Sequence, residues 1–89
     1  MLQEKVTIIN KLGLHTRAAA KLVAAANKFE SKIEIIRDSE KANCKSIMSI
    51  ILLGVTKGVT LDLIISGADE HAAREAIINL INNKFDEKE

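Results

Sequence analysis

The chain has 89 residues, 47% of them hydrophobic, which suits one compact domain over residues 1–89 and leaves no room for a second. Charged residues make up 28% of the chain but nearly cancel, to a net charge of +1, and only 2% of the residues are aromatic. So little net charge, with no tyrosine or tryptophan, argues against nucleic acid and an anionic membrane as partners.

The N-terminal segment is predicted to be a strand. Residues 2–9 alternate and are rich in β-branched side chains, with Val6 and Ile8 on one face. Asn10 and Gly13 then interrupt the pattern. The charges at positions 4 and 5 leave no long apolar run, so neither a signal peptide nor a membrane span is expected, and we predict a soluble cytoplasmic protein.

The next segment, from Thr16 to Phe29, is predicted to be an amphipathic helix. It is rich in alanine, the best helix former, and its apolar residues recur at helical spacing. The expected buried stripe consists of Ala19, Leu22, Ala26 and Phe29.

A hairpin and a short helix are expected next. Residues 32–37 alternate like a strand, residues 38–40 form a polar turn, and a second strand runs through Cys44. Cys44 is the only cysteine, so an internal disulfide and a thiolate metal cluster are excluded, and we expect it to be a small buried residue in a reducing compartment. Ser46 precedes the apolar run IMSIILL and is predicted to cap a helix that ends at Gly54.

The last third of the chain predicts one strand and one helix. Residues 59–66 alternate clearly, between Gly58 and Gly67. A helix is expected from about Asp69 to Phe85, and residues 86–89 are expected to fray into solvent. The order β-α-β-β-α-β-α predicts an α+β fold, an open-faced β-sandwich with a four-stranded antiparallel sheet covered on one face by three helices.

The stretch LGLHTRA carries the most chemistry. It places His15 where the first helix begins, and unpaired backbone N–H groups and the helix dipole would favour a phosphoryl group there. The same potential disfavours imidazolium and leaves a neutral, nucleophilic ring. Arg17 can pair with the phosphate oxygens through two donors. On the spacing alone, a surface turn without chemistry remains the more frequent explanation.

Other candidate sites have simpler explanations. His71 has no partner pattern for a metal, and no glycine-rich nucleotide motif occurs, so neither a metal nor a cofactor is expected. Two acidic pairs are interpreted as solvated or first-turn charges rather than as an acid and a base. These pairs are Glu30 with Glu34 and Asp69 with Glu70.

LGLHTRA, AAKLVAAANKF and KSIMSI together resemble HPr, the histidine-containing phosphocarrier family of the bacterial phosphoenolpyruvate-dependent phosphotransferase system, over nearly the whole chain. The resemblance implies that His15 takes a phosphoryl group on Nδ1 from phosphorylated enzyme I and gives it to an enzyme II A component. It implies that Arg17 assists this transfer, and that Ser46 is a regulatory site for a serine kinase and phosphorylase. Such a protein is a phosphocarrier without enzymatic turnover, and we expect a monomer.

The chain departs from the family pattern at Ala18, where proline is usual. Alanine fixes the helix start less but adds a backbone donor, so we expect the chemistry to survive. Ala18, together with NKLGLH and KSIM, makes the chain similar to proteobacterial and nitrogen-branch members of the family. The pathway that the protein serves, sugar uptake or the regulation of nitrogen or carbon use, therefore stays open.

The short helix after Ser46 predicts a docking surface, because it holds more apolar residues than its underside can bury. The expected partner-binding residues are Thr16, Lys21, Ile47, Met48, Ile51 and Leu52. Two other functions stay open: a small acyl-phosphate hydrolase, for which no water-positioning amide is evident near Arg17, and a regulatory binding module with His15 unused.

Overall fold

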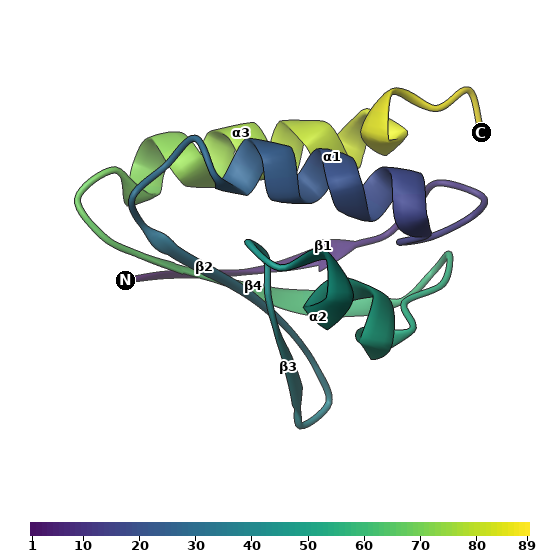
Figure 1. Cartoon of the computed structure of the whole chain (residues 1–89), viewed down its shortest axis with the longest axis horizontal. Coiled ribbons are helices and arrows are strands. Elements are labelled where there is room, and N and C mark those ends of the chain that lie inside the picture. The colour runs from purple at the N-terminus through teal and green to yellow at the C-terminus, as the bar shows by residue number, and fades with distance from the viewer.

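The computed structural model describes residues 1–89 and shows one sheet with helices on one side (Figure 1). The elements follow in the predicted order, with a short left-handed 3₁₀-type turn added near the C-terminus. The strands are β1 (Leu2–Thr7), β2 (Lys32–Arg37), β3 (Glu40–Asn43) and β4 (Thr60–Ser66), and the helices are α1 (Thr16–Ala26), α2 (Ile47–Leu53), α3 (Glu70–Asn82) and η1 (Lys84–Asp86). The predicted α+β fold is confirmed.

The sheet has the order β1-β4-β2-β3, and all three neighbouring pairs are antiparallel. The register places Val6 opposite Leu61 and Ile35 opposite Leu63. The last strand in sequence therefore enters the sheet between β1 and β2, while α1 and α2 carry the chain across the covered face.

The core lies between the sheet and the helices. Every second residue of the strands faces the helices, as the alternation predicts, while Lys5 and Asp62 pair at 3.0 Å on the open face. No helix combines the length and the apolar character needed to span a bilayer. The fully buried large apolar side chains are Ile8, Leu22, Ile33, Ile35, Ile50, Leu61, Leu63, Ile65, Ile77 and Phe85.

Two predicted elements end earlier than expected. The first strand ends at Thr7 rather than at residue 9, although Ile8 still receives a hydrogen bond from the Gly58 N–H at 2.7 Å. Helix α1 ends at Ala26 rather than at Phe29. The N–H groups of Lys28 and Phe29 bond to carbonyls three residues back, so the chain leaves the α-helix in a tightened turn.

The short helix α2 forms as predicted. The Ser46 hydroxyl accepts a hydrogen bond from the Ser49 N–H at 3.3 Å, and Gly54 ends the helix with a φ of 66°. Cys44 is fully buried, and burial raises the pKa of its thiol to about 12. A thiol so placed stays protonated and unreactive.

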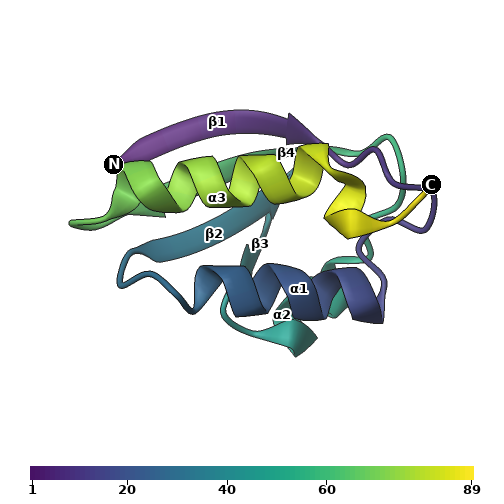
Figure 2. The same cartoon turned by 90° about the horizontal axis from the view of Figure 1, so that it is seen from above.

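The C-terminal prediction was wrong in two respects. Helix α3 ends at Asn82, before Phe85, and the last residues are held by hydrogen bonds, although Asp86, Lys88 and Glu89 are exposed to solvent. Phe85 is fully buried, and the backbone N–H of Lys11 donates to the carbonyl of Glu89 at 2.6 Å. The burial of one large aromatic ring holds the tail against the domain, and the tail returns beside the start of α1 (Figure 2).

Candidate functional site

His15 stands at the start of α1, and the turn before it fixes that position. Gly13 has a φ of 65°, which favours glycine, and a Cβ there would lie 2.5 Å from the carbonyl oxygen of Val55. The next residue, Leu14, is buried and donates its N–H to the same carbonyl at 3.0 Å. The close approach to Val55 therefore sets where the helix begins.

Helix α1 itself provides neither a side-chain cap nor an acidic residue that would offset the positive end of its dipole. His15 is the N-cap residue, with extended backbone and no capping hydrogen bond from its side chain, and no acidic residue lies in the first turn. The Ala19 N–H makes the first helical bond, to the His15 carbonyl at 2.8 Å, so the three preceding amides have no helical partner. The positive end of the helix dipole and these amides suit a phosphoryl group beside His15.

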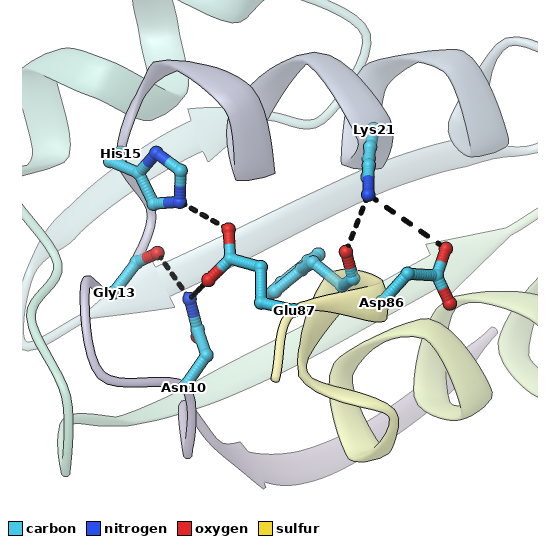
Figure 3. A network of polar contacts seen from close by, with 7 residues as sticks. Asn10, Gly13, His15, Lys21, Asp86 and Glu87 are labelled. Carbon is cyan, nitrogen blue, oxygen red and sulfur yellow. Dashed lines mark hydrogen bonds and ion pairs between the residues drawn. The ribbon is translucent and has the colours of Figure 1, made fainter. Parts of the chain in front are cut away.

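The imidazole has a partner that the sequence did not indicate. Its Nε2 atom forms a hydrogen bond with the Glu87 carboxylate, and Nδ1 lies on the side of the ring away from that carboxylate (Figure 3). The Asn10 amide also donates to Glu87, at 2.9 Å. The Asn10 hydrogen bond first, and then the one with His15, hold the pKa of Glu87 below its ordinary value.

The site opens into a pocket of about 710 Å³ that mixes charges of both signs. Arg17 is exposed on the first turn of α1 and forms no ion pair within the protein, so its guanidinium is available to an anion. Lys21 donates to the Phe85 carbonyl at 2.8 Å and lies 3.9 Å from the Asp86 carboxylate. The residues that line the pocket are Lys11, Leu12, His15, Arg17, Lys21, Asp86, Glu87, Lys88 and Glu89.

An apolar surface lies on α2, which packs beside α1 (Figures 1 and 2). Met48 is 62% exposed, Leu52 is 75% exposed and Ile47 is 40% exposed, whereas Ile51 packs against the core. Leu12, which lines the pocket, is 64% exposed and was not predicted. We call Ile47, Met48 and Leu52 the apolar face. Thr16 is exposed at the first position of α1.

Asp69 and His71, for which the sequence predicts no chemistry, both lie near the start of α3. Asp69 accepts hydrogen bonds from the Glu30 N–H and the Ser31 N–H, at 2.8 and 2.9 Å, and so ties the start of α3 to the loop before β2. His71 is exposed near the start of α3, at the opposite end of the helical layer from the start of α1 (Figure 1).

The family model described as "PTS HPr component phosphorylation site" matches residues 2–83. The chain belongs to the HPr family. It is a phosphocarrier protein of the phosphotransferase system, and the predicted resemblance is confirmed.

Two curated relatives and two crystal structures show how close the similarity is. The chain is 45% identical to the phosphocarrier protein HPr of Cupriavidus necator over the full length of both chains, and 43% identical to the phosphocarrier protein NPr of Shewanella violacea over 97% of this chain and 94% of that protein. An HPr crystal structure from Thermoanaerobacter tengcongensis has 44% identity and a TM-score of 0.96 with both chains fully covered. An HPr dimer from the same organism has 45% identity and a TM-score of 0.79, with 98% and 100% of the chains covered.

Ala18, the departure from the usual HPr proline, is fully buried in the first turn of α1. A small apolar residue fits this position beside the core, and helix α1 begins at Thr16 without a proline. Of the HPr site that sequence reasoning predicted, the structure brings His15, Arg17 and Lys21 to one pocket. It adds Glu87, for which the local sequence carries no signal.

Proposed function

We propose that His15 is the phosphoryl acceptor of this HPr-family chain and reacts through Nδ1. Enzyme I in its phosphorylated form is the donor, and an enzyme II A component is the acceptor. The protein acts as a monomer in the cytoplasm. It holds the phosphoryl group transiently as phosphohistidine and has no enzymatic turnover of its own. The observation that carries the proposal is the position of His15 at a helix N-terminus with unpaired amides and no acidic neighbour in the first turn.

Arg17 has a defined part in this proposal. Its exposed guanidinium lies two residues from His15 on the same turn and is free of ion pairs within the protein. A planar guanidinium can donate two parallel hydrogen bonds to phosphate oxygens and offset their charge during transfer. Arg17 therefore stabilises the phosphoryl group while Nδ1 forms and later loses its bond to phosphorus.

The alternatives have less support. An acyl-phosphate hydrolase needs a group that positions water, and the one amide near His15, that of Asn10, is buried and directed at Glu87 and Gly13. A regulatory module with His15 unused would leave the unpaired amides and Arg17 without a role. Membership of the HPr family favours neither alternative.

The proposal is tested by incubating the protein with phosphoenolpyruvate and catalytic amounts of enzyme I. We expect one phosphate per chain, labile in acid and stable in alkali, which peptide mapping places on His15. A phosphate on another residue, or steady release of free phosphate at a catalytic rate, would contradict the proposal.

We further propose that the apolar face is where enzyme I and the A component dock in turn, with Thr16 and Lys21 at its border. Methionine adapts its shape readily, and Met48 is 62% exposed, so one surface can meet two different partners. Ser46, partly buried at the N-terminus of α2, adjoins this face. Phosphorylation of Ser46 by a serine kinase would then block docking without unfolding the helix.

A matched pair of substitutions at Ser46 tests the blocking effect. Aspartate and asparagine cap helices as well as serine does, so Ser46→Asp and Ser46→Asn should both keep the stability of the protein, whereas Ser46→Ala should lose about 1 kcal/mol. Only the aspartate variant places a charge against the docking partner, and we expect it to accept phosphate from enzyme I about tenfold more slowly. Equal rates for the two variants would show that charge at residue 46 does not control docking.

A further inference from the structure

The C-terminal segment, residues 83–89, reverses direction beside the active site. Lys84, Phe85 and Asp86 have φ values of 56°, 55° and 63°, a run of three left-handed residues without a glycine. Such a run costs free energy that the surroundings must offset. Phe85 is fully buried and its carbonyl accepts a hydrogen bond from Lys21 at 2.8 Å, so the reversal is held in place. As a result, the Glu87 carboxylate lies within hydrogen-bonding distance of the Nε2 atom of His15.

Two nitrogen atoms converge on the Glu87 carboxylate, as Figure 3 shows. Asn10 Nδ2 donates to Oε1 at 2.9 Å, and His15 Nε2 contacts Oε2. The orientation of the Asn10 amide is settled by its second contact, because Nδ2 also donates to the Gly13 carbonyl at 2.8 Å. The opposite orientation would place the amide oxygen against two acceptors. Asn10 is fully buried, so its amide is held in this position.

An ionised carboxylate only accepts hydrogen bonds. Nε2 must therefore bring a proton to its contact with Glu87, and in a neutral imidazole the lone pair then lies on Nδ1. The side chain of Glu87 is 15% exposed and that of His15 is 27% exposed, so solvent competes only partly for this contact. The pair thus distinguishes the two ring nitrogens chemically.

We propose that Glu87 is a positioning residue for phosphoryl transfer, and that it holds His15 in the tautomer with the proton on Nε2 so that Nδ1 is the nucleophile. Asn10 fixes the carboxylate in the orientation that this requires. The proposal deepens the assignment of His15 as the phosphoryl acceptor and depends on it.

The transfer step balances in this arrangement. The Nδ1 lone pair forms the bond to phosphorus, and the bond from phosphorus to the donor breaks with its electron pair leaving on the donor. The proton stays on Nε2, so the phosphorylated ring carries a positive charge that the Glu87 carboxylate offsets. A ring kept protonated is also the better leaving group when the phosphoryl group passes to the next acceptor.

The first measurement is the tautomer of His15 in the unphosphorylated protein, read from the ¹⁵N chemical shifts of the ring. At about pH 8.5, two units above the ordinary imidazole value of about 6.5, a histidine ring is neutral. We expect the wild-type protein to show a protonated Nε2 and an unprotonated Nδ1. A proton on Nδ1, or equal sharing between the two nitrogens, would overturn the proposal from the wild-type spectrum alone.

The second measurement compares Glu87→Gln with Glu75→Gln. Each removes one carboxylate charge, but Glu75 is exposed on α3, lies outside the pocket and forms no ion pair. A glutamine at 87 offers one acceptor to two donors, so we expect averaged tautomer shifts and phosphoryl acceptance from enzyme I about fivefold to tenfold slower. The Glu75 variant should keep the wild-type tautomer and stay within about twofold of the wild-type rate.

The two proposals fail differently. If the wild-type protein takes no phosphate on His15, the assignment of the acceptor is wrong whatever the tautomer. If His15 is phosphorylated but Glu87→Gln matches the wild type in tautomer and in rate, only the role of Glu87 is wrong. The amide spectrum of each variant, recorded on the same sample, shows whether it is folded.

Discussion

Replacing His15 with alanine should reduce phosphorylation by phosphoenolpyruvate and enzyme I about 1,000-fold or more, to the background of the assay. The imidazole is the only nucleophile at the start of α1 that can attack phosphorus without a separate general base, and alanine removes it. Arg17 and the helix amides would remain, but they bind and stabilise a phosphoryl group and cannot form a bond to phosphorus. The measurement is transfer of labelled phosphate from phosphoenolpyruvate to the protein.

His71→Ala is the matched control for this experiment. It removes the second histidine by the same substitution, from the exposed start of α3 at the opposite end of the helical layer. We expect its labelling to equal that of the wild type. Because the His15 side chain makes no capping hydrogen bond, both variants should remain folded, as circular dichroism would show. Acid-labile phosphate on the His15→Ala protein would refute the assignment of the acceptor.

The fold could be predicted because its signals are local. The alternation of residues 59–66 and the alanine-rich segment before Asn27 each indicate one element without reference to the rest of the chain. Ser46 and Gly54 mark both ends of a helix whose apolar run could equally have been a strand. The four-stranded antiparallel sheet with helices on one face then follows from the β-α-β-β-α-β-α sequence of elements and the rules of connection, whereas the strand order β1-β4-β2-β3 was not predicted.

The C-terminal segment could not be predicted in this way. The sequence after α3 is short and charged, which is the pattern of a solvated end, and its structure depends on contacts more than 70 positions away in the chain. Phe85 was the one available signal, because a large aromatic residue beyond a helix end has to be buried somewhere. Even that signal does not indicate that Glu87 meets His15.

The members of the candidate site that lie close together in the sequence could be predicted, and those from distant segments could not. His15 and Arg17 belong to one continuous motif at a helix start, so their proximity needs no tertiary information. Asn10 was interpreted only as an interruption of the strand, whereas the structure buries it completely and directs its amide at Glu87. Positioning groups from distant segments are the part of a site that local sequence patterns do not reveal.

Replacing Gly13 with alanine should lower the free energy of unfolding by about 3 kcal/mol or more. Two costs combine. The φ of 65° is unfavourable for any residue with a Cβ, and that Cβ would lie 2.5 Å from the Val55 carbonyl oxygen and 2.8 Å from the Thr56 Cα. Both neighbours are backbone atoms, so the turn before His15 has to move. For a domain of this size the midpoint of thermal unfolding should fall by about 15 °C.

Gly54→Ala separates the two costs, because Gly54 has nearly the same φ, 66°, with no atom within 4 Å of the added Cβ. It should lose only about 1 kcal/mol in urea unfolding, the conformational part alone. The close approach of Gly13 to Val55 also sets the start of α1, so Gly13→Ala should slow phosphoryl acceptance even at temperatures where it is fully folded, and Gly54→Ala should not. Equal losses of stability in the two variants would mean that residue 13 is a glycine for its backbone conformation only. In that case the position of His15 would not depend on the contact with Val55.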